Sequence, residues 1–256
     1  MNLKKHRIYI LGCPIDVLTL EETLTIIDKA IQEKKHIYHI AVNAAKLVRM
    51  KKDRELYESV VNADIINADG MAVVWASKLI GKPLPERVAG IDLMQEVVKL
   101  AYKRGYKIFF FGAEEDVVKK VVEKYSKEYS PEIIAGYRNG YYSDEEEATI
   151  AEQIANSRAN ILFVAMSSPK KEKFLYKYRD VLKNVNFIMG VGGSFDVIAG
   201  KVKRAPKWMQ NAGLEWFYRF LQEPKRMWKR AFVDNSKFIL LVAKEFIRIK
   251  LRKNKN

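Results

Sequence analysis

Short apolar runs alternate with amphipathic segments along the first 200 residues of the chain. An apolar run that ends at Gly, Asn or Asp is typical of a buried strand, and apolar residues at every third or fourth position are typical of a helix that covers a sheet. The predicted strands are 7–12, 36–43, 64–70, 107–112, 160–166 and 186–193, and the predicted helices are 20–33, 44–60, 92–104, 115–128, 144–157 and 169–182.

This alternation predicts an α/β protein with a Rossmann-like, mostly parallel sheet and helices on both of its faces. In such sheets the ligand binds beyond the carboxyl ends of the strands. The segments that leave the predicted strands therefore mark the expected site. They contain Asn43, Asp69, Gly70, Gly112, Ser167, Ser168, Gly192 and Gly193.

The pattern changes after residue 200. Residues 201–256 hold 16 Lys/Arg and 4 Asp/Glu, a net charge of +12, whereas residues 1–200 carry a net charge of only +3. Three of the four tryptophans, Trp208, Trp216 and Trp228, lie in this last segment. We therefore predict a Rossmann-like domain at 1–200 and a basic, Trp-rich C-terminal appendage at 201–256.

Local signals predict how the appendage folds. Pro224 is expected to break it into two helical pieces, because proline cannot continue the hydrogen-bonding pattern of a helix. The second piece is expected to start after an N-cap at Ser236 and to be amphipathic only in its second half.

Positive charge among large apolar side chains favours a partner that is anionic and apolar, and an anionic membrane surface fits best. Nucleic acids attract the same charge, but the segment holds no recognised nucleic-acid motif, so a nucleic-acid-binding module is the weaker alternative. No window approaches the roughly 18–20 apolar residues of a transmembrane helix, and the first apolar run is too short for a signal peptide. We therefore expect a cytoplasmic protein, bound peripherally to the inner face of the cell membrane.

Single residues add weaker signals, each with two interpretations. Asp69 can cap a helix or act as a general base at the ligand edge. Arg87 lies in a Pro-rich loop, where it can be solvated or can bind phosphate through two hydrogen bonds. Lys171 follows a helix start at Pro169, where backbone N–H groups and lysines can hold an anion. Asp196 can bind a sugar or ribose hydroxyl or can serve as a cap.

Other residue types restrict the chemistry. The single cysteine, Cys13, excludes an internal disulfide and is expected to be a core residue. The three histidines lack the spacing of a metal site, and no Asp-x-Asp pair occurs. We therefore expect no metal and no cofactor, and the sequence leaves a homo-oligomer open.

Taken together, four segments resemble the WecG/TagA/CpsF family of glycosyltransferases, glycosyltransferase family 26. They read ADG at 68–70, PERVAGIDL at 85–93, SPKKE at 168–172 and VGGSFDVIAGKVKRAPKWMQNAGLEWFYRFLQEPKR at 191–226. The resemblance implies transfer of a sugar, N-acetylmannosamine in one branch, from a UDP-sugar donor to a polyprenyl-diphosphate-linked sugar acceptor. It also implies a product used in wall teichoic acid or another surface polysaccharide.

The resemblance also assigns roles to individual residues. It makes Asp69 the base, with Asn43 and Arg87 as further catalytic residues. It places the arginines that complete the site in the appendage segment that holds Arg219, Arg226 and Arg230. Positions at the expected ligand edge add Ser168, Lys171, Gly192, Gly193 and Asp196 as candidates for substrate binding. Without a metal, Arg and Lys must neutralise the departing diphosphate of the donor. The appendage supplies much of this charge, so one segment is expected both to bind lipid and to complete the site.

Two positions depart from the family pattern. Ala41 stands where the family often has Thr, and Lys171 stands where it has Gln. These differences leave the donor open, so glucuronic acid or glucose donors are alternatives to N-acetylmannosamine. They also leave a non-catalytic scaffold in polysaccharide synthesis as a further alternative, which hydrolysis of a UDP-sugar by the purified protein would exclude.

Overall fold

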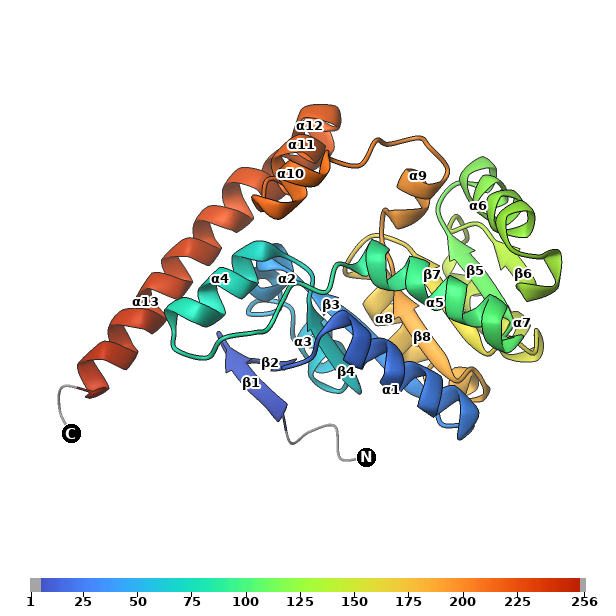
Figure 1. Ribbon diagram of the computed structural model, residues 1–256, viewed down its shortest axis with the longest axis horizontal. Coiled ribbons are helices and arrows are strands. Elements are labelled where there is room, and N and C mark those ends of the chain that lie inside the picture. Colours follow the sequence, from blue (N-terminus) through green and yellow to red (C-terminus); the bar gives the residue numbers. More distant parts are fainter. Residues whose placement is uncertain (1–5, 254–256) are drawn as a thin grey trace.

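A six-stranded parallel sheet forms the centre of the molecule (Figure 1). The computed structural model describes residues 6–253. Along the sheet the strands follow the order β4 (Ile65–Ala68), β3 (Ile37–Val42), β8 (Phe187–Gly190), β7 (Ile161–Ala165), β5 (Ile108–Gly112) and β6 (Ile134–Arg138). The chain thus passes from β3 to β4 at one edge and then crosses to the other half. This reversal brings β3 and β8 side by side, and ligand sites favour such a position.

Helices cover both faces of the sheet, as the alternation predicts. Side chains of β5 show the division, because Phe110 packs in one core cluster and Phe109 and Phe111 in another. The first face is covered by α1 (Leu20–Gln32), α5 (Gly90–Arg104) and α6 (Glu115–Glu128). The second is covered by α2 (Ala44–Arg49), α3 (Arg54–Val61), α7 (Glu147–Asn156) and α8 (Lys170–Lys177).

Two strand assignments differ from the prediction. The segment predicted as a buried strand at 7–12 instead forms β1 (Arg7–Ile10), which pairs antiparallel with β2 (Cys13–Asp16) outside the large sheet. Leu11 and Gly12 adopt positive φ angles between them and turn the chain back. Strand β6 was not predicted, because it lies at the sheet edge, is only partly buried and lacks an apolar run.

The predicted helices exist, but some are shorter or divided. The predicted helix 44–60 is two helices, because Asp53 leaves the helical conformation and caps α3 through the N–H of Leu56. A helix after Asp69, α4 (Met71–Leu79), completes the domain beside β4. Cys13 is buried, as predicted for a core residue, and burial raises the pKa of its thiol to about 12.

Beyond β8 the described residues form helices joined by loops, the longest loop being 199–206. The helices are α9 (Ser194–Ile198), α10 (Lys207–Asn211), α11 (Glu215–Gln222), α12 (Pro224–Trp228), a π-helical stretch (Lys229–Asp234) and α13 (Asn235–Lys253). Pro224 does separate two helices, as predicted. The N-cap predicted at Ser236 is wrong, because the chain enters α13 directly from the π-helical stretch and Ser236 is already helical.

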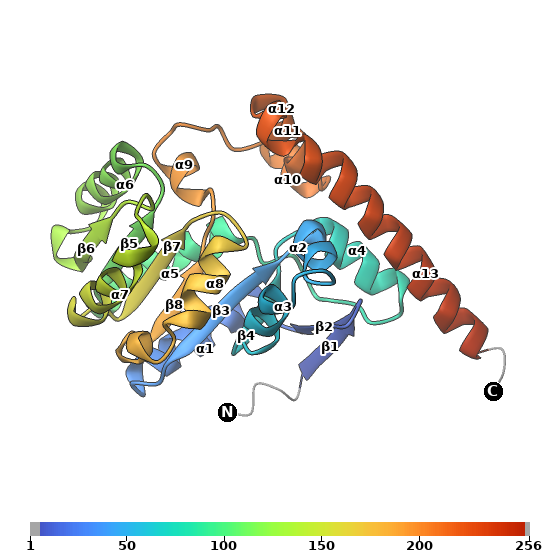
Figure 2. The ribbon, with the colours of Figure 1, turned by 180° about the vertical axis from the view of Figure 1, so that it is seen from behind.

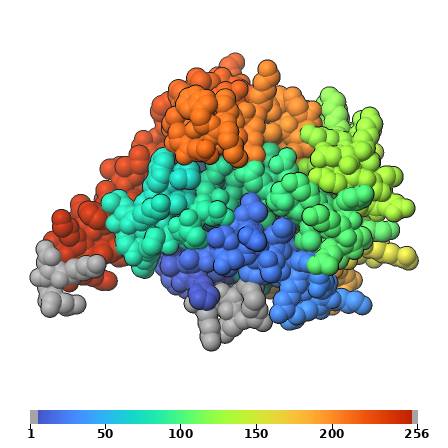
Figure 3. Space-filling view, in the orientation of Figure 1, coloured from blue at the N-terminus to red at the C-terminus, as the bar shows by residue number. Residues whose placement is uncertain are grey.

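Helix α13 runs along the outer side of α2 and α4 and extends past the β1–β2 hairpin (Figures 1 and 2). The space-filling view shows its last turns projecting from the body of the molecule (Figure 3). Its inner side contributes Phe238 and Val242 to the core, where they are 3% and 6% exposed. Arg49 of α2 adds an ion pair with Asp234 at 2.7 Å. Among the described residues, no helix is both long and apolar enough to span a bilayer.

Candidate active site

A pocket of about 410 Å³ opens at the carboxyl edge of the sheet. Its walls come from the segments after β3, β4, β7 and β8, and from α11 and α12 of the appendage. Ten of the predicted site residues line it, namely Asn43, Asp69, Arg87, Ser168, Lys171, Gly192, Gly193, Arg219, Arg226 and Arg230. The eleventh, Asp196, is not among the lining residues, but its carboxylate lies 3.8 Å from Arg226.

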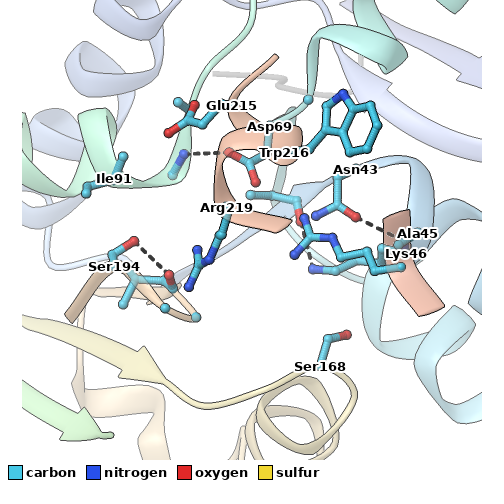
Figure 4. A pocket seen from close by; sticks show the side chains of 18 of the residues that line it. Asn43, Ala45, Lys46, Asp69, Ile91, Ser168, Ser194, Glu215, Trp216 and Arg219 are labelled. Atoms are coloured by element: carbon cyan, nitrogen blue, oxygen red, sulfur yellow. Dashed lines mark hydrogen bonds between the residues drawn. The ribbon is translucent and has the colours of Figure 1, made fainter. Parts of the chain in front are cut away.

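Asp69 is held in place by a backbone hydrogen bond. Its Oδ1 accepts a hydrogen bond of 2.9 Å from the N–H of Gly90, at the start of α5. The alternative in which Asp69 caps the helix that follows it is wrong, since Gly70 occupies the cap position of α4. Oδ2 makes no hydrogen bond with any described residue. One carboxylate oxygen is thus fixed, and the other is available to a ligand (Figure 4).

Asn43 has a structural bond as well as a place in the pocket. It is the N-cap of α2, and its Oδ1 accepts a hydrogen bond of 3.1 Å from the N–H of Lys46. This bond fixes the side chain at the end of β3. The amide NH₂ of Asn43 remains free of hydrogen bonds to the described residues.

Arg87 begins a chain of ion pairs that joins the domain to the appendage. Its Nη1 lies 2.8 Å from Glu215 of α11, and Glu215 in turn lies 3.4 Å from Arg204. Arg204 donates two hydrogen bonds, of 2.6 and 2.8 Å, to Asp92 of α5. Such a bidentate pair fixes orientation as well as charge. The sequence did not identify Glu215, which holds Arg87 at the pocket.

Arg219 reaches across the glycines that follow β8. A Cβ atom built on Gly193 would overlap the Arg219 guanidinium, so only glycine leaves room for this approach. Gly192 adopts a φ of +54°, which also favours glycine. The two glycines therefore allow the loop after β8 to lie against the Arg219 side chain.

This contact yields a first prediction. Gly193→Ala should displace the Arg219 guanidinium from the pocket and lower kcat/KM by roughly tenfold or more, as expected for a lost charged contact. Folding should survive, because the overlapping atoms belong to the flexible end of a side chain. Steady-state kinetics and the melting temperature measure the two effects. A Gly193→Ala enzyme with normal kinetics would contradict this packing.

The pocket is strongly cationic. Seven Lys or Arg side chains line it against two carboxylates, Asp69 and Glu215. The cations are Lys46, Arg49, Arg87, Lys171, Arg219, Arg226 and Arg230. Desolvation lowers the pKa of Arg230, although Asp69 opposes the shift. The arrangement is suited to a ligand that carries several negative charges.

Sequence reasoning missed Lys46 and Glu172, which form a buried ionic cluster with Lys171. Lys46 Nζ lies 2.8 Å from Glu172 and donates to the carbonyl of Ala41 at 2.7 Å. Lys171 Nζ lies 3.1 Å from the same Glu172 oxygen. Burial opposes ionisation of Glu172, but the two lysines outweigh it and lower its pKa to about 2. No local signal marks Lys46, whose position in a helix is typical of a solvated lysine.

The described residues 6–253 contain no group of three or more His, Cys, Asp or Glu placed to hold a metal ion. The arrangement instead offers one fixed carboxylate beside many cations. It can take a proton at Asp69 and stabilise an anionic leaving group across the same pocket. Transfer of a group from a phosphorylated donor needs both.

Comparison with known proteins agrees with this class of site. The chain belongs to the glycosyl transferase WecG/TagA/CpsF family, which it matches over residues 8–253. The protein is therefore a glycosyltransferase, and the assignment made from the sequence motifs is confirmed.

Two curated relatives are similar over most of their length. One, from Bacillus subtilis (strain 168), is 43% identical over 194 residues, which cover 76% of this chain and 74% of the relative. The other, from Bacillus spizizenii, is 41% identical over 189 residues, which cover 73% and 72%. Both are named N-acetylglucosaminyldiphosphoundecaprenol N-acetyl-beta-D-mannosaminyltransferase.

Proposed function

We propose that the protein transfers N-acetylmannosamine, with inversion, from its UDP donor to a polyprenyl-diphosphate-linked N-acetylglucosamine during wall teichoic acid synthesis. The observation that carries the proposal is a fixed carboxylate, Asp69, in a pocket with an excess of cations. The relatives' names supply the sugar and the acceptor. A different UDP-sugar, with glucuronic acid or glucose, remains the alternative donor, because Lys171 and Ala41 depart from the family pattern.

In this mechanism Asp69 takes the proton from the acceptor hydroxyl. The hydroxyl oxygen then attacks the anomeric carbon of the donor, and the bond between that carbon and the diphosphate oxygen breaks. The electron pair leaves with UDP, whose added negative charge is stabilised by pocket cations. The hydrogen bond from Gly90 orients the Asp69 carboxylate, and the free amide of Asn43 is placed to contact the acceptor or donor sugar.

The acceptor explains why a membrane partner is proposed. A polyprenyl chain stays in the bilayer, so the enzyme must work at the membrane surface to reach the diphosphate-linked sugar. The appendage lines the pocket with Trp216, Arg219, Arg226 and Arg230 and also carries exposed apolar side chains. We therefore propose peripheral binding at the inner face of the cell membrane, through the appendage.

A direct assay tests the proposed function. The purified protein is incubated with UDP-N-acetylmannosamine and a short-chain polyprenyl-diphosphate N-acetylglucosamine, and the disaccharide lipid is detected by mass spectrometry. Parallel reactions with UDP-glucose and UDP-glucuronic acid test the alternative donors. A scaffold without catalytic activity would give neither product nor slow hydrolysis of any UDP-sugar.

A second prediction concerns metal removal. Arg87 and at least one of Arg219, Arg226 and Arg230 are proposed to stabilise the leaving diphosphate, so transfer should continue at an undiminished rate in EDTA. The rate is compared with and without the chelator, and after addition of magnesium or manganese. Activity that disappears in EDTA and returns with either metal would contradict the role given to these arginines.

A further inference from the structure

Two buried ammonium groups share one carboxylate at one side of the pocket. Lys46, Lys171 and Glu172 are 6%, 7% and 1% exposed. The side chain of Lys171 reaches the pocket over Gly190, where a Cβ atom would lie only 2.9 Å from its Cδ and Cε atoms. Both lysines line the pocket, whereas Glu172 does not. The pocket wall therefore presents the cations and hides the anion.

The cluster is left with excess charge and unused donors. One carboxylate neutralises one ammonium group, so a net positive charge remains buried, which is costly without a partner. Lys171 Nζ has Glu172 as its only polar partner among the described residues, which leaves two of its three N–H donors unused. The nearby Ser168 hydroxyl is also buried and unpartnered among the described residues, and Ser168 lines the same pocket. Figure 4 shows Ser168 across the open space from Asp69.

We propose that Lys171 and Lys46, with the Ser168 hydroxyl, form a subsite for an oxyanion of the UDP-sugar donor. The oxyanion is either the donor diphosphate or a carboxylate on its sugar. This inference rests on the proposed function and extends it to particular residues. Lys171 stands where the family pattern has Gln, which carries no charge. In this subsite the donor would contact cations of the sheet domain in addition to the arginines of the appendage.

The charge on Lys171 is tuned by its surroundings. Burial lowers its pKa to about 8, although Glu172 acts in the opposite direction. The positive charges of Lys46 and Arg230 add to the lowering. Lys171 should therefore lose its charge as the pH rises past about 8, and donor affinity should fall over the same range. The Lys171→Gln protein should lack this decrease, and Lys171→Arg should shift it to higher pH.

Calorimetric titration with three ligands tests the subsite. UDP, UDP-glucose and UDP-glucuronic acid are added to the wild type, Lys171→Gln and Lys183→Gln, the last being an exposed lysine outside the pocket. If the oxyanion is the diphosphate, Lys171→Gln weakens all three by about tenfold or more. If it is a sugar carboxylate, only UDP-glucuronic acid is weakened.

Two other outcomes overturn the inference, and they can be told apart. Equal binding of all three ligands by the wild type and Lys171→Gln would remove the subsite and leave the proposed function intact. A wild type that binds none of the three and also forms no disaccharide lipid in the transfer assay would remove both.

The melting temperature distinguishes a binding role of Lys171 from a structural role. A buried cation that has no ligand bound to it destabilises the free protein. Lys171→Gln should therefore raise the melting temperature while it weakens binding. Because the folded-state pKa lies below the ordinary value of 10.5, wild-type stability should rise between about pH 8 and 10.5, and the difference from Lys171→Gln should shrink. A lower melting temperature for Lys171→Gln at pH 7 would assign Lys171 a structural role instead.

Discussion

Asp69→Asn is expected to lower turnover by roughly 10²–10⁴-fold, the usual contribution of a general base. Asn has the same shape as Asp, and its side-chain oxygen can still accept the hydrogen bond from Gly90, so the start of α5 should stay in place. What the substitution removes is the ability to take the proton of the acceptor hydroxyl. Turnover is measured with saturating donor and acceptor, because the change should affect kcat more than KM.

The matched control is Asp180→Asn, which makes the same chemical change at a carboxylate that is 95% exposed. That variant should keep normal turnover, and both should keep the wild-type melting temperature within a few degrees. Near-normal turnover in Asp69→Asn would assign the base elsewhere. A large loss of melting temperature would instead show that the charge on Asp69 stabilises the start of α5.

The sequence predicted the central residues of the site because parallel topology places them. The carboxyl ends of parallel strands share one edge, so Asn43 after β3 and Asp69 after β4 were expected at the same edge of the sheet. They are neighbours because β3 pairs directly with β4, which the sequence did not predict. The hydrogen bonds that hold these side chains could not be predicted. The partner of Asp69 is Gly90, which is 21 residues away in the chain, and no local pattern identifies it.

The features that were missed depend on strand order. Lys46 on α2 and Lys171 on α8 meet only because β3, before α2, lies next to β8, and β8 lies next to β7, which precedes α8. The hydrophobic pattern predicts strands but not their order. The pairing of Arg87 with Glu215 likewise spans 128 residues and depends on how the appendage folds back over the pocket. The edge strand β6 shows a further limit, since partial burial leaves no apolar run to recognise.

The division at residue 200 remains a prediction, and the structure changes how it should be tested. Deleting 201–256 would remove Phe238 and Val242 from the core and expose the residues that they cover. Such a protein could unfold for reasons unrelated to membranes. A sharper test alters only the outer side of α13.

That outer side carries an apolar strip composed of Ile239, Leu240, Ile247 and Leu251, which are 55–65% exposed. At 100° per residue these four side chains fall within roughly one third of the helix circumference, away from Phe238 and Val242. The exposed lysines Lys237, Lys244 and Lys250 lie on the same helix. An exposed apolar strip with lysines beside it is typical of a helix that lies in a membrane surface.

Replacing all four strip residues with Gln is expected to reduce binding to anionic liposomes by at least roughly 10³-fold, since each buried side chain contributes about 1–2 kcal/mol. Transfer to a long-chain acceptor embedded in liposomes should fall in parallel. Transfer to a short-chain, water-soluble acceptor should change little, because none of the four residues lines the pocket. Liposome flotation and the two transfer assays measure these effects.

The control variant places Gln at Tyr57, Tyr102, Tyr137 and Val181, which are also exposed but lie on other elements. It should float with liposomes and transfer sugar as the wild type does. Raising the salt concentration should weaken flotation of both the wild type and the control, because the lysines act through screened charge. If the strip variant still floats and still uses the embedded acceptor, α13 is not the membrane contact. If it loses activity with the soluble acceptor as well, the strip supports the fold of the appendage rather than its place on the membrane.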